Sequence, residues 1–203
     1  MAQPALPDPA PAADHDNVVV LRGLTWADYE RILTIRGDAP VPRLAFLQGA
    51  LELMTPSKAH ESRKSIIGCL VEAWCFENDV DISPFGSWTL KDPGVERGVE
   101  PDECYIVGDR DAERPDLAIE VIHTSGGIDK LDAYRLLGVR ELWFHEGGTF
   151  QLFALRGDRY DVVTASEVLP GIDLELLGSF LPVRPMTRAV RAFRQALRER
   201  SRA

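Results

Sequence analysis

Residues 114–134 read RPDLAIEVIHTSGGIDKLDAY: an apolar segment that carries acids, then a glycine turn, then a helix start with a lysine. Residues 116–123 are nearly continuously apolar apart from Asp116 and Glu120, which predicts a strand covered on both faces. Side chains alternate along a strand, so Asp116 and Glu120 share one face. A carboxylate in such a strand is expensive to bury unless it meets a cation or a fixed donor. Glu120 is therefore the first candidate functional residue, whereas Asp116 is expected to be a strand-start acid.

The same stretch predicts how the chain connects around this strand. After the strand come a turn at residues 125–127, a helix at 129–137 and another apolar strand at 139–145. A strand, a short helix and a strand in immediate succession form a parallel crossover in most sheets. The turn should therefore bring the start of the helix back toward the strand that carries Glu120.

The remaining elements follow from apolar periodicity and turn residues. Residues 59–78 have the plainest helical pattern and predict a helix packed on a sheet. Residues 43–55 predict a hairpin that turns at Gln48 and Gly49 and places Glu52 beside apolar neighbours. The other predicted elements are helices at 25–35, 174–180 and 186–200, strands at 80–91 and 99–107, and a hairpin at 149–164. This order is of the mixed α/β class.

Asp102 supports a site at Glu120 because it lies in the predicted strand at 99–107. If the two strands are neighbours, the two carboxylates converge. Two acids held close together repel each other unless a divalent cation lies between them, and hard oxygen ligands suit Mg²⁺ or Mn²⁺. Lys130, in the first turn of the following helix, then approaches the same point and stabilises phosphoryl oxygens or holds the nucleophilic water. Taken alone, Lys130 would be an ordinary solvated lysine.

Five segments of the chain together resemble a known family. They are GALELMTPSKAH, GVEPD, PDLAIEVIHTS, IDKLDAYRLLGV and ELWF. Their order and spacing are similar to those of the Uma-two family of restriction-endonuclease-like proteins, which looks like a branch of the PD-(D/E)XK nuclease superfamily. The resemblance covers residues 24–181. It implies a restriction-endonuclease-like core, in which helices flank a central mixed sheet, and a metal-dependent phosphodiesterase site.

The resemblance also implies roles for individual residues. Asp102 matches the first acid of the superfamily signature and Glu120 the second. The usual lysine of the signature falls on Ile122 and is missing, while Lys130 matches a lysine that this family carries on the next helix. The implied catalytic residues are Asp102, Glu120 and Lys130; the implied metal ligands are Glu52, Asp102 and Glu120; and His60 is a possible accessory residue.

Length and composition fit one globular domain, since the chain has 203 residues, of which 45% are hydrophobic and 27% charged. Residues 1–17 are dense in proline, alanine and aspartate and are expected to form a disordered tail, with a single domain over residues 18–203. We find neither a secretory signal nor an apolar run long enough to span a bilayer, so we expect a cytoplasmic protein without membrane contact. The three cysteines form no CxxC pair and are expected to be packing residues.

The charge balance argues against indiscriminate binding to a polyanion, because the formal net charge is −9. A nucleic-acid partner would therefore need a local basic surface. The C-terminal segment offers one, although a solvated helix face is the simpler interpretation. Its arginines are Arg184, Arg188, Arg191, Arg194, Arg198, Arg200 and Arg202.

These observations lead to one main hypothesis and two alternatives. The main hypothesis is a Mg²⁺- or Mn²⁺-dependent endonuclease-like enzyme that hydrolyses nucleic acid, with DNA as the first candidate substrate. One alternative is a catalytically inactive, dimeric binding or scaffold protein on the same fold, which the acidic charge and Ile122 favour. The other is a hydrolase of small phosphoesters. The hairpin after Thr149 and the terminal helix are candidate surfaces for a homodimer.

Overall fold

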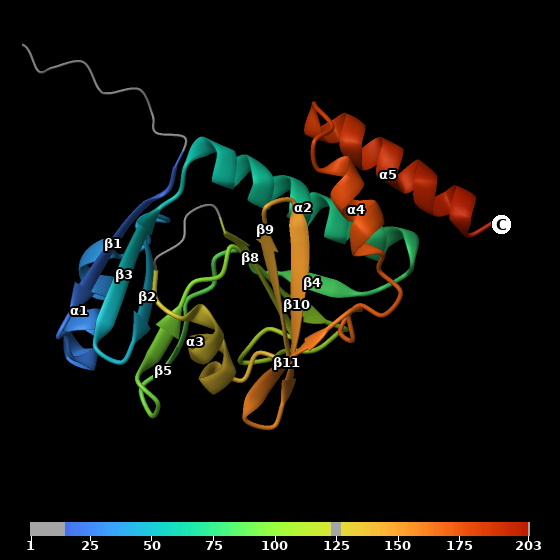
Figure 1. Ribbon diagram of the computed structural model, residues 1–203. Helices are drawn as coiled ribbons and strands as arrows, with labels where there is room; N and C mark the ends of the chain where they lie inside the picture. The colour runs from blue at the N-terminus through green and yellow to red at the C-terminus, as the bar shows by residue number, and fades with distance from the viewer. Residues whose placement is uncertain (1–14, 123–126, 203) are drawn as a thin grey trace, which may run out of the picture.

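The computed structural model describes residues 15–122 and 127–202, in which the strands form two sheets (Figure 1). The antiparallel sheet, in the order β1-β3-β2-β6-β5, comprises β1 (Asn17–Arg22), β2 (Arg43–Leu47), β3 (Ala50–Thr55), β5 (Leu90–Asp92) and β6 (Arg97–Val99). The mixed sheet, in the order β11-β10-β9-β8-β7-β4, comprises β4 (Ile82–Pro84), β7 (Glu103–Val107), β8 (Leu117–Ile122), β9 (Glu141–Glu146), β10 (Thr149–Arg156) and β11 (Arg159–Val163). The helices are α1 (Trp26–Arg36), α2 (Lys58–Glu77), α3 (Lys130–Leu137), α4 (Leu174–Phe180) and α5 (Met186–Arg200).

The predicted crossover is confirmed at the centre of the mixed sheet. Strands β8 and β9 are parallel, with Glu120 opposite Phe144, and α3 lies between them in the chain. Strand β7 pairs antiparallel with the other side of β8, so the strand that follows Asp102 is indeed the neighbour of the strand that carries Glu120. The mixed class and the mixed sheet are therefore as expected, whereas the second, antiparallel sheet was not anticipated.

Two strands predicted as continuous are divided between the two sheets. The segment at 80–91 contains β4 and β5, which are separated by a bend in which Gly86 has a φ of 54°. The segment at 99–107 is interrupted at Pro101, which has no backbone N–H to donate to a sheet. Asp102 thus lies where the chain passes from one sheet to the other, immediately before β7.

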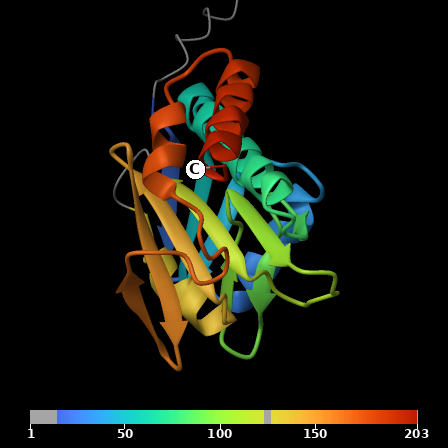
Figure 2. The same cartoon turned by 90° about the vertical axis from the view of Figure 1, so that its right-hand side faces the viewer.

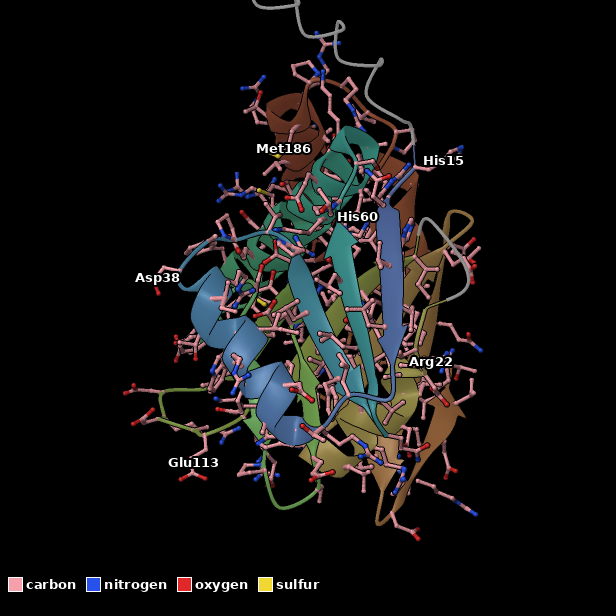
Figure 3. The ribbon with its side chains drawn as sticks, turned by 90° about the vertical axis from the view of Figure 1, so that its left-hand side faces the viewer. His15, Arg22, Asp38, His60, Glu113 and Met186 are labelled. Atoms are coloured by element: carbon pink, nitrogen blue, oxygen red, sulfur yellow. The ribbon has the colours of Figure 1, made fainter. Side chains whose placement is uncertain are left out.

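Three hydrophobic clusters hold the layers together. The first joins α2, α4 and α5 to one face of the mixed sheet (Figure 2). The second lies between the two sheets and includes residues of α3, such as Tyr134 and Leu137. The third joins α1 to the outer face of the antiparallel sheet, as Figure 3 shows. The space between the sheets is therefore partly filled by α3.

Strand alternation directs two of the candidate acids into this space. On β8, Ile119 packs toward α2, while Ala118 belongs to the cluster between the sheets, so Glu120 faces that cluster too. On β3, Leu51 packs toward α1, so Glu52 faces away from α1. Glu52 and Glu120, from different sheets, thus point toward the same region.

The predicted helices and hairpins are confirmed with small changes at their ends. Thr25 caps α1 through a capping box with Asp28. Gln48 and Gly49 form the first hairpin turn with φ values of 49° and 78°. None of the helices in the described part of the chain combines the length and apolarity needed to cross a membrane.

The ordered domain begins earlier than composition indicates. Asn17 is the first residue of β1, and Asp16 is only 8% exposed, although both were assigned to the tail. Asp16 is held by contacts with the start of α2, which the composition of the segment does not reveal. Two other predictions, His123 as a strand residue and the turn at 125–126, lie outside the described residues.

Candidate functional site

Glu120 is a buried carboxylate with two donors from α3. Its side chain is 2% exposed, and its Oε2 accepts a hydrogen bond from Nζ of Lys130 at 2.8 Å. Its Oε1 accepts from the hydroxyl of Tyr134 at 2.5 Å. Lys130 and Tyr134 are four residues apart and so lie on one face of α3. The predicted meeting of Lys130 with Glu120 is confirmed, and the arrangement fixes both oxygens of the carboxylate.

The surroundings of Lys130 and Tyr134 keep both of these α3 donors protonated. Burial by itself lowers the pKa of Lys130, but the charges of Glu120 and Glu52 and the hydrogen bond to Glu120 outweigh it and raise that pKa above its ordinary value. Burial, reinforced by the charge of Glu120, raises the pKa of Tyr134 well above its ordinary value. Lys130 is therefore a charged donor at neutral pH and is not suited to act as a base.

Glu52 approaches the same region from β3. It is 5% exposed, and its Oε2 accepts from the backbone N–H of Ile128 at 2.9 Å. A Cβ added to Gly127 would lie 2.0 Å from this oxygen, so only glycine fits there without a shift. The segment that leads into α3 thus closes directly on the Glu52 carboxylate.

Glu52, Glu120 and Lys130 share a pocket of about 320 Å³. Residues from both sheets and from the start of α3 form its wall. They are Asp16, Val18, Glu52, Met54, Glu120, Val121, Ile122, Gly127, Ile128, Asp129, Lys130, Leu131, Phe144 and Glu146. The wall is rich in acids, and Lys130 is its one basic residue among those described.

Asp102 lies next to this pocket and is not part of its wall. It is 1% exposed, and its Oδ2 accepts from the backbone N–H of Val121 at 2.6 Å. Its Oδ1 contacts Nε2 of His60 at 2.9 Å and also meets the guanidinium of Arg43. One oxygen of the carboxylate therefore contacts side chains of α2 and β2, while the other binds the backbone of β8 next to Glu120.

His60 connects Asp102 to an acid from the N-terminal segment. The imidazole is fully buried, and its Nδ1 lies 2.9 Å from Oδ2 of Asp16. The other oxygen of Asp16 accepts from the backbone N–H of Ser57 at 2.7 Å. Burial lowers the pKa of His60, although the charge of Asp16 acts in the opposite direction. Figure 3 shows His60 at the end of the antiparallel sheet where β1 begins.

The predicted metal ligands are brought together only in part. Residues 15–122 and 127–202 contain no group of three or more His, Cys, Asp or Glu side chains arranged to hold a metal ion. Asp102 is not part of the pocket wall, and its oxygens contact Val121, His60 and Arg43, so Glu52, Asp102 and Glu120 are not gathered into one three-carboxylate site. The pair Glu52 and Glu120 does fit the way Mg²⁺ is commonly held, by one or two carboxylates together with waters and substrate phosphates.

Other buried acids have structural partners that account for them. Asp116 accepts from Arg140 and from the backbone of Val107 and meets Arg110, which confirms it as a strand-start acid outside the site. Glu100 accepts from Arg36 at 2.7 Å and from Thr89 at 2.6 Å.

The C-terminal arginines are partly neutralised within the chain. Arg194 and Arg198 both bind Glu77 at the end of α2, and Arg200 binds Asp173 before α4. These contacts favour a role in packing the terminal helix over a dedicated basic surface. Cys104 is buried in the cluster between the sheets, as expected for a packing residue.

Sequence reasoning missed Asp16, the partner of His60. Asp16 lies in a proline-rich segment, and no periodic pattern of apolar residues marks it as part of the domain. It also gave no separate role to Tyr134, although the spacing of four residues from Lys130 places both on one helix face.

A family model described as "Uma2: Putative restriction endonuclease" matches residues 26–184. The chain belongs to the Uma2 family. The Uma2 match contains Glu52, His60, Asp102, Glu120 and Lys130, whereas Asp16 lies outside it. No curated protein matches the chain. Among solved structures, a crystal structure from Anabaena variabilis described as "a putative nuclease belonging to DUF820" is similar with a TM-score of 0.47 and 13% identity, over 84% of this chain and 99% of that one.

Proposed function

We propose that this chain hydrolyses phosphodiester bonds in nucleic acid, with DNA as the first candidate substrate and Mg²⁺ or Mn²⁺ as cofactor. The observation that carries the proposal is the buried Glu120 carboxylate, held by Lys130 and Tyr134 in the pocket that it shares with Glu52. Membership of the Uma2 family supports a nuclease-like reaction.

The residues of the pocket have distinct roles in this proposal. Glu52 and Glu120 would hold the divalent cation, whose chemistry is to polarise a phosphate and to lower the pKa of a bound water. Lys130, kept charged by its two acidic neighbours, donates to a phosphoryl oxygen and stabilises the negative charge that develops in the transition state. Tyr134 holds Glu120 in one orientation, which keeps the geometry of the site fixed before substrate binds.

Charge and size favour one alternative substrate class. The net charge of −9 and the acid-lined pocket oppose the approach of a polyanion. A pocket of about 320 Å³ lies at the small end of the range for ligand sites. A small phosphodiester would encounter less of this repulsion than a nucleic acid would, so it is the second candidate substrate.

The direct test measures hydrolysis of single-stranded DNA, plasmid DNA, RNA and bis(p-nitrophenyl) phosphate with Mg²⁺, Mn²⁺ or a chelator. Glu120→Gln removes the charge at the centre of the site and should abolish hydrolysis. Glu113→Gln is the matched control, because the same chemical change is made at an exposed residue far from His60 (Figure 3). Circular dichroism should show that both variants are folded.

The outcomes separate the hypotheses. Metal-dependent cleavage of nucleic acid that Glu120→Gln abolishes supports the proposal, and activity on the small diester alone supports the second candidate. Activity that survives Glu120→Gln would contradict the assigned site. If folded wild-type protein hydrolyses nothing and binds no Mn²⁺, the inactive scaffold is favoured, and sedimentation would then test whether it is a homodimer.

A further inference from the structure

Asp16, His60 and Asp102 form a continuous buried chain of contacts. The two ring nitrogens of His60 each face one carboxylate oxygen at 2.9 Å, from Asp16 on one side and Asp102 on the other. All three side chains are less than a tenth exposed. Burying ionisable groups is costly unless each is paired, and each of these three groups is paired with its neighbour.

The chain of contacts ends at the backbone next to Glu120. Asp102 accepts from the N–H of Val121 at 2.6 Å, and Val121 directly follows Glu120 on β8. Rotation of the Asp102 carboxylate would release this amide and shift the backbone that orients Glu120. His60 restrains such rotation from the opposite side, and Asp16 in turn fixes the ring of His60.

Two elements, β1 and α2, position Asp16 to hold the ring of His60. It immediately precedes β1, whose Asn17 pairs with Thr55 of β3. Its Oδ1 accepts from the N–H of Ser57, the residue that caps α2. β1 is an edge strand with Val19 55% exposed, so burial contributes little to fixing its start. The contacts of Asp16 with Ser57 and His60 therefore determine where β1 begins relative to α2.

We infer that Asp16 is a positioning residue of the proposed phosphodiesterase site, acting through His60 and Asp102 on the backbone beside Glu120. The inference rests on the proposed function and adds a residue that lies outside the Uma2 match. Asp16 also lines the pocket, so a substitution of Asp16 affects the site both directly and through His60 and Asp102. Asp16 does not itself take part in the chemistry.

The ring of His60 lies between two acceptors. Oδ2 of Asp16 faces Nδ1, and Oδ1 of Asp102, which also meets the guanidinium of Arg43, faces Nε2. A neutral imidazole can donate to only one of them, and the ¹⁵N chemical shifts of the ring report which nitrogen carries the proton.

The test compares full-length wild type with Asp16→Asn and Asp16→Ala. An asparagine at this position has one acceptor oxygen in place of two, and an alanine has none. Asp38→Asn, in the exposed loop after α1, is the matched control. Three quantities are measured for each protein: the Kd for Mn²⁺, the kcat and KM for the best substrate, and the ¹⁵N shifts of the His60 ring, assigned with a His60→Gln variant.

We expect the losses typical of residues that orient metal ligands, about 10- to 100-fold in kcat or in Mn²⁺ affinity for Asp16→Asn and more for Asp16→Ala. KM should change little, the His60 signals should move, and Asp38→Asn should match wild type. A purely structural role would lower Tm and leave kcat and Kd unchanged in the folded variants, and that result would overturn the inference.

Failure of the proposed function can be told apart from failure of the inference. If wild type binds Mn²⁺ but hydrolyses nothing, the proposed reaction fails, while a weaker Kd in Asp16→Asn still supports the positioning role. If wild type neither binds Mn²⁺ nor hydrolyses any substrate, both fail. Unchanged ring signals of His60 in Asp16→Asn would contradict the inference in every case.

Discussion

Breaking the buried ion pair between Lys130 and Glu120 should destabilise the fold far more than breaking an exposed pair of equal length. Lys91 and Glu30 are the matched control, because their N–O distance is also 2.8 Å. The side chains of Lys130 and Glu120 are 20% and 2% exposed, whereas those of Lys91 and Glu30 are both 41% exposed. The two pairs therefore differ mainly in their access to water.

The expected magnitudes follow from this difference. At 2.8 Å the attraction between unit charges is about 6 kcal/mol at an effective dielectric constant of about 20, and about 1.5 kcal/mol in bulk water. Desolvation offsets much of the larger value in the intact pair. Lys130→Met, however, leaves the Glu120 charge buried without its partner, which costs about 3–5 kcal/mol of unfolding free energy. Lys91→Met should cost about 0–1 kcal/mol.

Urea unfolding of two double-mutant cycles measures these energies. One cycle combines Lys130→Met with Glu120→Gln, and the other combines Lys91→Met with Glu30→Gln. We expect a coupling energy of about 2 kcal/mol or more in the first cycle and of less than about 1 kcal/mol in the second. Equal coupling energies in the two cycles would refute the buried contact between Lys130 and Glu120.

Two further predictions concern the loop beside Glu52 and Glu103, a half-buried acid on β7. Gly127→Ala would place a Cβ 2.0 Å from Oε2 of Glu52 and displace that carboxylate by about 1 Å, which can lower kcat by about 10²-fold. In a DNA-cleavage assay, Gly178→Ala, whose Cβ meets nothing within 4 Å, should behave as wild type, and equal activity of the two variants would contradict the closure on Glu52. Burial raises the pKa of Glu103 from 4.5 to about 7, so its contribution to the stability of the fold falls as pH rises through that window, by about 3 kcal/mol in all. Thermal unfolding should show that Glu103→Gln stabilises the protein more at pH 8 than at pH 4. If the Tm of wild type and of Glu103→Gln depend on pH in the same way, the raised pKa of Glu103 is contradicted.

Local relations in the site could be predicted from the sequence. Glu120 and Lys130 are ten residues apart and belong to the first strand and the helix of a parallel crossover, so their meeting follows from strand alternation and connection rules. The same rules place Asp102 beside the strand of Glu120. The direction of the Asp102 carboxylate could not be predicted, because His60 and Arg43, from distant parts of the chain, determine it.

The division of the strands into two sheets left little signal in the sequence. A chain that passes from one sheet to another keeps its apolar alternation on both sides of the crossing, so residues 99–107 look like one strand. Only Pro101 marked the interruption. Asp16 escaped notice for a related reason, since its place in the domain depends on contacts with the start of α2 and not on local pattern.

We propose that Glu52 and Glu120 form a cation site in the pocket with Lys130. Crystals of the wild type and of Glu120→Gln, grown with Mn²⁺, test it by anomalous scattering at the manganese edge. We expect one anomalous peak in the wild type, in contact with the carboxylates of Glu52 and Glu120, and its loss in the variant. A pocket with no manganese peak, or a peak that the variant retains, would contradict it.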